Sequence, residues 1–322
     1  MSVIVTGAAG FVGYHVAEAL LGRGEQVVGV DNYTPYYDPA LKTGRVALLE
    51  GRPGFEMVRL DIADEEAFAA LVQRVRPRAV VHLAAQAGVR WSIAKPFAYQ
   101  HANLKGHLSV LEACRHAQGL EHLVYASSSS VYGDRPLSGP FRETDPVDSP
   151  VSLYAATKRS CELMSAAYAR LYGFPQSGLR FFTVYGPWGR PDMAYFLFTR
   201  AILAGEPIEV FGQGKLARDF TFIDDIVDGV VGVLDRPPEQ GSHRILNIGD
   251  SRPIGLMQMI SSLEAALGRE AIKVFKDAQA GDVTATYADV SAISALTGYS
   301  PKVPLEEGLV RFAHWYRGWA GA

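Results

Sequence analysis

The sequence predicts an α/β protein in which helices cover both faces of a parallel, doubly wound sheet. Two observations lead to this prediction. Short apolar runs alternate with helical patterns over the first half of the chain, and the first of these runs leads directly into a glycine-rich turn. With 322 residues, 48% of them hydrophobic, the chain has enough apolar material for one large α/β unit that carries a smaller second domain.

The expected elements follow one another in the order that such a sheet requires. The apolar runs predict strands over residues 2–6, 26–30, 56–60, 79–83 and 122–126. Helical patterns cover residues 12–22, 65–75, 98–117 and 154–172. Alternation of this kind is typical of a parallel sheet, since parallel neighbours need a long crossover between them.

The second half of the chain departs from this alternation. Apolar stretches at residues 178–182 and 244–248 predict two further strands, but the segments around them are rich in Gly, Pro and aromatic residues. We interpret these segments as a smaller α/β domain interleaved with the end of the first. Residues 1–180 are therefore expected to form the first domain, with a returning segment near residues 220–250, and residues 181–322 the second.

Composition excludes several classes of protein. A net charge of -3 gives no overall attraction to nucleic acid or to anionic membranes. The two cysteines, Cys114 and Cys161, both fall in helical patterns and cannot build a disulfide framework or a cysteine-based zinc site. No apolar run approaches the roughly 18 residues that a membrane span needs, and no basic leader precedes the first strand. We expect a cytoplasmic protein with no metal site.

The turn after the first strand indicates a cofactor site. Gly7, Gly10 and Gly13 recur at intervals of three, which permits a tight turn and lets backbone amides approach a pyrophosphate at a helix N-terminus. Phe11 and Val12, between the second and third glycines, are expected to contact the cofactor. This arrangement is typical of Rossmann-type dinucleotide sites, although the spacing is not G-x-G-x-x-G, and an ordinary glycine-rich turn is the alternative.

Two acidic positions indicate which dinucleotide the site binds. Asp31 ends the second strand, where a carboxylate accepts hydrogen bonds from both adenosine ribose hydroxyls and repels a 2'-phosphate, so NAD is favoured over NADP. The alternative is a turn-forming Asp in the pair Asp31-Asn32. After the third strand, Asp61 and Ile62 would contact the adenine, and an N-cap for the helix over residues 65–75 is nearly as good an explanation of Asp61.

A Tyr-Lys pair carries the clearest catalytic signal. Tyr154 and Lys158 are four residues apart in a helical pattern and so lie on one face. A phenol beside a lysine and an oxidised nicotinamide is expected to have a lowered pKa and could remove a proton from a sugar hydroxyl. Upstream, the run from Ser127 to Ser130 follows a strand at the edge where ligands of open sheets bind. A surface helix pair and a flexible serine loop are the alternatives.

Four motifs occur together in this chain. They are Gly7-x-x-Gly10-x-x-Gly13, Leu83-Ala84-Ala85-Gln86, Ser127-Ser128-Ser129-Ser130-Val131-Tyr132-Gly133 and Tyr154-x-x-x-Lys158. Together they resemble the extended short-chain dehydrogenase/reductase family of nucleotide-sugar enzymes, and the resemblance covers essentially the whole chain. It implies that Tyr154 is the catalytic base, that Lys158 holds the nicotinamide ribose and tunes the base, and that Ser128 supplies a catalytic hydroxyl.

The resemblance implies further contacts with NAD and with a UDP-sugar. Cofactor contacts are expected from Asn32, Leu83, Ala84, Ala85, Gln86, Asn103 and Phe181. Phe211-Gly212-Gln213-Gly214 followed by Arg218 resembles the segment that holds uracil and grips the diphosphate. Asp282 matches the position that hydrogen-bonds the uridine ribose, and Gln279 stands where some members carry a phosphate-binding arginine. The expected UDP contacts are thus Val210, Phe211, Gln213, Arg218, Gln279 and Asp282.

Within this family the chain is most similar to UDP-glucuronate 4-epimerases, on the segments Ala85-Gln86-Ala87-Gly88-Val89-Arg90 and Arg180-Phe181-Phe182-Thr183-Val184-Tyr185-Gly186-Pro187. The implied reaction is epimerisation at carbon 4, from UDP-glucuronate to UDP-galacturonate, by hydride transfer through a 4-keto sugar with NAD recycled. The resemblance places Thr183, Arg190 and the serine run around the sugar carboxylate, and Arg90 near the mouth of the site.

Other activities are weighed against this one. Ser129 and Ser130 stand where 4,6-dehydratases carry an Asp-Glu pair and uronate decarboxylases a Glu, and serines cannot supply that acid and base chemistry. UDP-glucose 4-epimerisation and a non-catalytic NAD-binding scaffold remain the alternatives. The helical patterns over residues 98–117 and 154–172 carry apolar residues beyond one face, and the matching helices of family members form a dimer seam, so a homodimer is expected.

Overall fold

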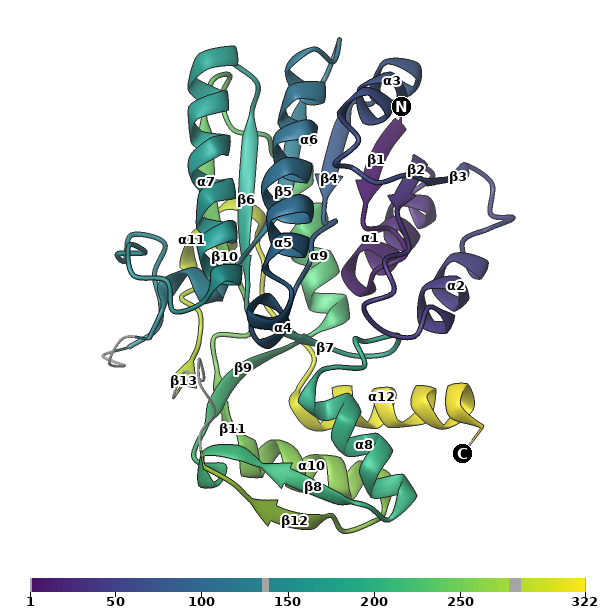
Figure 1. Ribbon diagram of the computed structural model, residues 1–322, viewed down its shortest axis with the longest axis vertical. Helices are drawn as coiled ribbons and strands as arrows, with labels where there is room; N and C mark the ends of the chain where they lie inside the picture. Colours follow the sequence, from purple (N-terminus) through teal and green to yellow (C-terminus); the bar gives the residue numbers. More distant parts are fainter. Residues whose placement is uncertain (1, 135–138, 278–284, 322) are drawn as a thin grey trace.

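The computed structural model describes residues 2–134, 139–277 and 285–321, and its largest element is a seven-stranded sheet (Figure 1). The strand order is β10-β6-β5-β4-β1-β2-β3, and every neighbouring pair is parallel. The strands are β1 (Ser2–Thr6), β2 (Gln26–Asp31), β3 (Phe55–Arg59), β4 (Ala79–His82), β5 (His122–Ser128), β6 (Gln176–Phe181) and β10 (His243–Ile248). The predicted fold class is confirmed, and each predicted strand end lies within two residues of the observed one.

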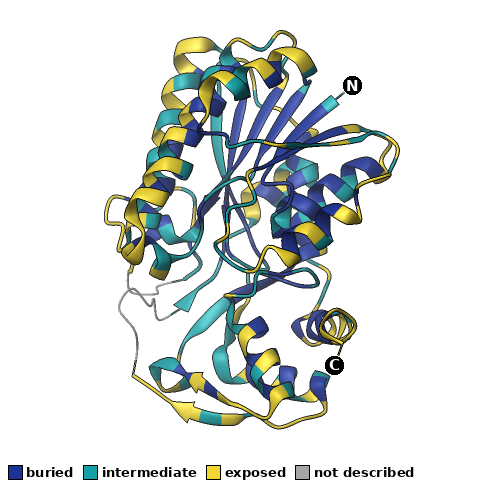
Figure 2. Cartoon of the chain, turned by 45° about the vertical axis from the view of Figure 1, so that its right-hand side comes forward, coloured by how far each residue is buried: buried dark blue, intermediate teal, exposed yellow. Residues whose placement is uncertain are grey.

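Helices cover both faces of this sheet because successive strand residues point to opposite sides. Val3 and Val5 of β1 pack in the same cluster as α1 (Phe11–Gly22) and α9 (Ile223–Leu234), which contact each other. Ile4, between them, packs in a second cluster on the other face. The helices of that face are α3 (Glu65–Val75), α6 (Gly106–Arg115) and α7 (Leu153–Tyr172). Figure 2 shows the central strands buried between these two layers.

Two details of the helices differ from the prediction. The pattern over residues 98–117 is not one regular helix: α5 (Pro96–Tyr99) runs into a π-helical turn, η1 (Gln100–Lys105), before α6 begins. The alternative role of Asp61 as the N-cap of α3 is wrong. Asp64 is the N-cap, since its carboxylate accepts a hydrogen bond from the backbone N–H of Ala67 at 3.1 Å.

A smaller layer lies below the carboxyl ends of the large sheet (Figure 1). It contains β7 (Thr183–Tyr185), β9 (Ala217–Phe222), β11 (Pro253–Gly255) and β13 (Ala285–Thr286) in one sheet, and β8 (Pro207–Val210) paired with β12 (Ile272–Phe275). Its helices are α8 (Ala194–Ala204), α10 (Leu256–Leu267) and α12 (Leu305–Ala320), while α11 (Ser291–Thr297) contacts β10 and α9. Short elements α2 (Ala40–Ala47), α4 (Val89–Ala94), η2 (Ser129–Tyr132) and η3 (Phe211–Gly214) complete the described chain.

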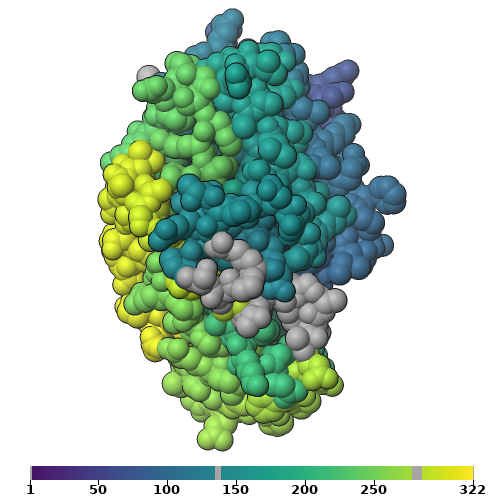
Figure 3. Space-filling model, turned by 90° about the vertical axis from the view of Figure 1, so that its left-hand side faces the viewer, coloured from purple at the N-terminus to yellow at the C-terminus, as the bar shows by residue number. Residues whose placement is uncertain are grey.

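The chain returns from the smaller layer to the large sheet. After β9, helix α9 packs against α1, and β10 then pairs with β6 as the edge strand of the large sheet. In the space-filling view the green residues of this segment lie beside the teal residues of α7 (Figure 3). None of the described helices is both long and apolar enough to cross a membrane.

Candidate active site

A cavity of about 980 Å³ lies at the carboxyl ends of the parallel strands and extends into the smaller layer. The strand order reverses between β1 and β4, and ligands of open α/β sheets bind at such a switch point. The wall includes Gly7 after β1, Asp31 at the end of β2, Leu83 after β4, Ser128 at the end of β5 and Phe181 at the end of β6. Residues from distant parts of the sequence therefore share one site.

The glycine-rich turn requires glycine at each end. Gly7 has a φ of +73°, a conformation that side chains disfavour, and an added Cβ would lie 2.7 Å from the backbone nitrogen of Ala84. A Cβ on Gly13 would lie 2.0 Å from the carbonyl oxygen of Gly7. Helix α1 begins at Phe11, so its first amides face the cavity, which Phe11 and Val12 also line. The turn and the helix start form a cradle suited to a pyrophosphate.

Asp31 lines the cavity, and its carboxylate has two protein partners. It accepts hydrogen bonds from the backbone N–H of Tyr33 at 2.8 Å and from the ammonium of Lys42 at 3.1 Å. Asp61 lies nearby and accepts from the side chain of Asn32 at 3.1 Å. The two acidic positions predicted from the sequence are thus brought together around the second and third strands, and Ile62 lies beside them on the wall.

The Leu83–Gln86 motif lines the cavity, but Asn103 does not. Asn103 is buried behind the wall, where its side chain accepts from the backbone N–H of Gln86 at 2.8 Å and donates to the Gln86 carbonyl at 3.0 Å. Its amide also donates to the hydroxyl of Thr157 at 3.0 Å. Asn103 therefore holds Gln86 and α7 in place from behind the wall, and its contact with the cofactor stays a prediction.

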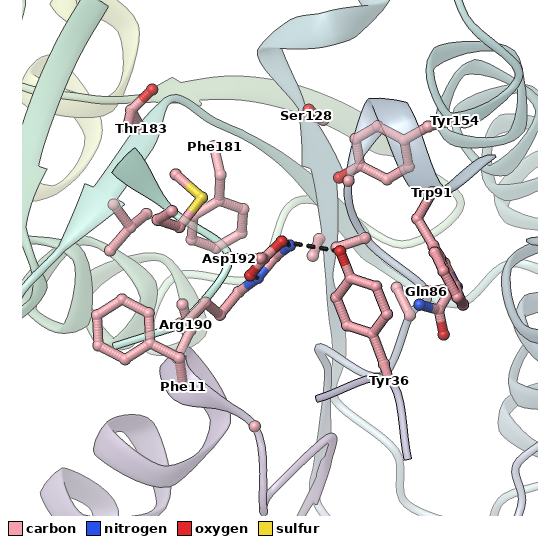
Figure 4. A pocket seen from close by; sticks show the side chains of 18 of the residues that line it. Phe11, Tyr36, Gln86, Trp91, Ser128, Tyr154, Phe181, Thr183, Arg190 and Asp192 are labelled. Atoms are coloured by element: carbon pink, nitrogen blue, oxygen red, sulfur yellow. Dashed lines mark hydrogen bonds and ion pairs between the residues drawn. The ribbon is translucent and has the colours of Figure 1, made fainter. Parts of the chain in front are cut away.

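Ser128, Tyr154 and Lys158 all lie on the cavity wall. Ser128 ends β5, and its hydroxyl accepts hydrogen bonds from the backbone N–H of Ser130 at 3.2 Å and from the Ser130 hydroxyl at 2.9 Å. Tyr154 projects from α7 into the pocket (Figure 4). Lys158, one turn later, is buried and donates to the carbonyl of Ala126 at 3.0 Å. The helical spacing read from the sequence therefore places both residues of the pair in the site.

A buried ion pair fixes α7 against β5 and β6. Glu162, one turn after Lys158, accepts hydrogen bonds from Arg180 Nε at 2.8 Å and Nη2 at 2.9 Å. The hydroxyl of Ser127, the neighbour of Ser128, donates to Glu162 at 2.6 Å. The Glu162 and Arg180 side chains are only 1% and 2% exposed. This network sets the position of the serine run relative to α7.

The cavity contains a second charged cluster around Arg190. Thr183 and Arg190 line it, as predicted. Arg190 donates to the carboxylate of Asp192 through Nε at 3.1 Å and Nη2 at 2.5 Å, and the hydroxyl of Tyr36 donates to Asp192 at 2.8 Å (Figure 4). Burial and the Asp192 charge raise the pKa of Tyr36 to about 12, so its hydroxyl stays a donor. Arg190 is thus held by protein partners at the pocket wall.

The predicted UDP-binding residues divide into three groups. Phe211 and Arg218 line the cavity, and the guanidinium of Arg90 lies over the Phe211 ring, 5.4 Å from its centroid. Two expected contacts are not on the wall. Val210 is fully buried, and the side chain of Gln213 donates to Asp277 at 3.3 Å. Gln279 and Asp282 lie outside the described residues.

Sequence reasoning missed several residues of the wall. Lys42, Tyr36, Asp192 and Trp91 all line the cavity. None of these four positions was among the predicted site residues, and Lys42 and Asp192 belong to no recognised motif. Their roles depend on contacts with Asp31 and Arg190 that only the folded chain creates.

Comparison with known proteins gives the family. The profile of the NAD dependent epimerase/dehydratase family matches residues 3–249. The chain belongs to this family. Among its relatives, UDP-glucuronate 4-epimerase 3 of Arabidopsis thaliana is 47% identical over 332 residues, which cover 99% of this chain and 77% of the relative.

Two solved structures are similar over nearly the whole chain. UDP-glucuronic acid 4-epimerase of Bacillus cereus, in complex with UDP-glucuronic acid and NAD, has a TM-score of 0.92 and 37% identity and covers 99% of this chain and 100% of its own. UDP-glucose 4-epimerase of Thermotoga maritima, with UDP-glucose, has a TM-score of 0.89 and 30% identity, with 99% and 100% coverage. The predicted resemblance is confirmed.

The family is NAD dependent, so the cofactor of this chain is NAD, as the sequence predicts. The residues present fit that group. Gly7 and Gly13 leave no room for a side chain, which keeps the turn tight at the start of α1, and Asp31 presents a carboxylate at the end of β2. These are the features that a pyrophosphate and a ribose require of such a fold.

Proposed function

We propose that this chain is a UDP-glucuronate 4-epimerase, which interconverts UDP-glucuronate and UDP-galacturonate. One observation carries the proposal: Ser128, Tyr154 and Lys158 line the same cavity as Thr183 and Arg190. The first three supply proton transfer at a sugar hydroxyl, and the last two supply recognition of a carboxylate. Two of the three similar proteins named above are UDP-glucuronate 4-epimerases, and they have the higher identities, which supports the same conclusion.

Each catalytic side chain has a distinct task in this reaction. When bound, NAD would accept a hydride from carbon 4 of the sugar and later return it to the opposite face. Tyr154 takes the proton of the 4-hydroxyl and gives it back after the ring of the 4-keto sugar has rotated to present its other face. Ser128 donates a hydrogen bond to the same oxygen, and Lys158 binds the nicotinamide ribose. The grip on UDP, through Phe211 and Arg218, retains the intermediate while its ring rotates.

Thr183, Arg190 and the serine hydroxyls hold the sugar carboxylate. A 4-keto uronate is a β-keto acid, and it loses carbon dioxide when the bond from carbon 5 to the carboxylate aligns with the carbonyl π system. Several hydrogen bonds to that carboxylate keep the bond out of alignment. Selectivity for the uronate and protection of the intermediate therefore depend on the same residues.

The remaining assignments belong to this proposal. Residues 1–180, with the returning segment near 220–250, form the NAD-binding domain, and residues 181–322 bind the UDP-sugar. The enzyme acts in the cytoplasm as a homodimer. Leu108 on α6 and Leu163 and Leu171 on α7 are 40%, 55% and 70% exposed, and a second copy would cover them. Sedimentation that shows only monomer at micromolar concentration would contradict the dimer.

A substrate panel tests the activity. Purified protein is supplied with UDP-glucuronate and with UDP-glucose, and the products are separated and identified by mass. We expect much faster turnover of UDP-glucuronate, without net consumption of NAD. Faster turnover of UDP-glucose would assign the chain to the neighbouring activity, and no turnover of either would favour a non-catalytic scaffold.

The carboxylate site has its own test. Thr183→Val and Arg190→Ala should slow epimerisation, narrow the preference for the uronate and raise the fraction of turnovers that end in a UDP-4-keto-pentose with NADH left on the enzyme. In the parent enzyme, bound UDP-glucose would leave these polar groups without the carboxylate, at a cost of about 1–3 kcal/mol for each buried group, and this cost is the source of the preference. Product masses and the absorbance of bound NADH measure the outcome, and normal epimerisation in both variants would remove these residues from the site.

A further inference from the structure

Arg45 is a charged residue of α2 that is completely buried. Its guanidinium makes five hydrogen bonds to four oxygens, all of them neutral. Nε donates to the carbonyl of Trp188 at 3.0 Å, and Nη2 donates to the carbonyls of Trp188 at 2.7 Å and Gly189 at 3.1 Å. Nη1 donates to the carbonyl of Ala9 at 2.9 Å and to the hydroxyl of Tyr37 at 2.8 Å. These bonds equal the full donor capacity of an arginine.

The acceptors belong to two segments that are far apart in the sequence. Ala9 lies in the glycine-rich cofactor turn, whereas Trp188 and Gly189 immediately precede Arg190. The planar fork of Arg45 therefore joins the NAD cradle to the loop over residues 187–190. A lysine could not do this, because its ammonium is a point charge with three donors.

The loop itself is shaped for this clamp. Trp188 has a φ of +59°, which is rare for a bulky residue, and its carbonyl receives two of the five bonds. The preceding carbonyl, of Pro187, accepts a hydrogen bond from His15 Nε2 of α1 at 3.0 Å. Gly189 has no room for a side chain, since an added Cβ would lie 1.9 Å from the hydroxyl oxygen of Tyr195. Three successive carbonyls are thus held by residues of the NAD-binding layer.

We propose that Arg45 is a positioning residue for substrate specificity: it fixes the loop over residues 187–190 against the cofactor turn and thereby aims Arg190 at the carboxylate of the sugar. This inference rests on the proposed function and deepens it. Arg45 itself lies outside the cavity wall, so it acts through Arg190 and not by contact with the substrate. Its loss should therefore weaken recognition of the carboxylate more than recognition of the rest of the ligand.

Binding of two ligands tests the inference. UDP-glucuronate and UDP-glucose differ only at carbon 6, so the ratio of their dissociation constants isolates the carboxylate. Calorimetry on NAD-loaded protein in a Tyr154→Phe background prevents turnover during the measurement. Arg45→Lys and Arg45→Met should weaken UDP-glucuronate at least about tenfold, which is the effect of losing one charge-assisted contact, and change UDP-glucose by less than about threefold.

Two further variants keep the test decisive. Tyr37→Phe removes one acceptor of Arg45 without disturbing its charge and should shift the ratio in the same direction by a smaller factor. Arg74→Met removes an exposed arginine of α3 that pairs with Glu56, far from the loop in sequence, and should leave the ratio unchanged. Retention of NAD, read from its absorbance after denaturation, checks that the cofactor layer remains intact.

The outcomes separate this inference from the proposed function. An equal loss of affinity for both ligands would reduce Arg45 to a purely structural role, and an unchanged ratio in all Arg45 and Tyr37 variants would overturn the inference. If the Arg45 variants do not fold, the ratio of dissociation constants in Tyr37→Phe still tests the inference. Failure of the parent enzyme to epimerise UDP-glucuronate, in the substrate panel above, would instead refute the proposed function.

Discussion

Glu162 offers the sharpest test of how the active site is held together. Its carboxylate accepts four hydrogen bonds, two from Arg180, one from Ser127 and one from Arg159. Burial raises the pKa of Glu162, but the hydrogen bonds and charge of Arg180 outweigh this and keep the pKa below its usual range. In Glu162→Gln the positive charge of Arg180 stays buried without a counter-charge. The new amide N–H₂ also faces groups that donated hydrogen bonds to the carboxylate, so donor faces donor.

The expected cost is large because neither partner reaches solvent. With side chains 1% and 2% exposed, solvent screening does not reduce it, and removing one member of a buried pair costs about 3–5 kcal/mol. A chain of this size should then lose roughly 4–7 °C in melting temperature. The native contribution of Glu162 is present above its unfolded pKa and is lost as the pH falls through the lower folded pKa, so the difference between parent and variant should shrink in acid.

Urea unfolding, followed by circular dichroism at neutral pH, measures this cost. Glu56→Gln is the matched control, since Glu56 and Arg74 form a surface pair with side chains 48% and 55% exposed, and it should cost less than about 1 kcal/mol. Adding Arg180→Met to Glu162→Gln should recover part of the loss by removing the stranded charge. A cost for Glu162→Gln no greater than that of the control would refute the reasoning.

Three further predictions concern chemistry, cofactor choice and pH. Tyr154→Phe should lower turnover at least about 100-fold and leave NAD binding nearly intact, and comparable activity would remove Tyr154 as the base. Asp31→Ala should weaken NAD retention and relax discrimination against NADP, measured by cofactor titration, because an acceptor and a repelling charge both vanish. Burial lowers the pKa of His107 to about 3 and of His122 to about 4. Above the unfolded pKa near 6.5 both histidines are neutral in the folded and in the unfolded chain, and the fold has its full stability. As the pH falls toward 4, only the unfolded chain takes up protons at these positions, and each histidine lowers the unfolding free energy by about 1.4 kcal/mol by pH 5.5. Burial also raises the pKa of Asp219 to about 6 and raises the pKa of Asp225, which opposes this trend. Burial lowers the pKa of His15 and of His243 to about 4 as well, so the unfolding free energy should still fall between pH 7.5 and 5.5, and a constant value would contradict the prediction.

Local sequence predicted the elements and the motif residues. Strand positions follow from short apolar runs, α3 from a helical pattern with the predicted ends, and the cofactor cradle from three glycines at fixed spacing. Tyr154 and Lys158 could be paired because a helix places residues four apart on one face. These features depend on neighbours within a few residues, so the chain itself contains the information.

Contacts between distant residues could not be predicted in this way. Nothing near Arg190 in the sequence shows that Arg45, 143 to 144 residues away from the carbonyls it binds, holds its loop. The hydrogen bonds between the Asn103 side chain and the backbone of Gln86 depend on the π-helical turn that contains Asn103, which the sequence did not predict. Lys42 pairs with Asp31 only because α2 folds back across the end of β2.

The sequence by itself therefore determined the fold class and the family, and it predicted the NAD and proton-transfer residues, because these follow from spacing and residue type. Tertiary structure alone decided which polar groups face the cavity and which are used up inside the protein. The physical reason is that a buried donor or acceptor must be paired, and its partner is set by packing of whole elements. Arg45 shows this most clearly: in the sequence it is one arginine in an amphipathic helix, and in the fold each of its five bonds has a defined acceptor.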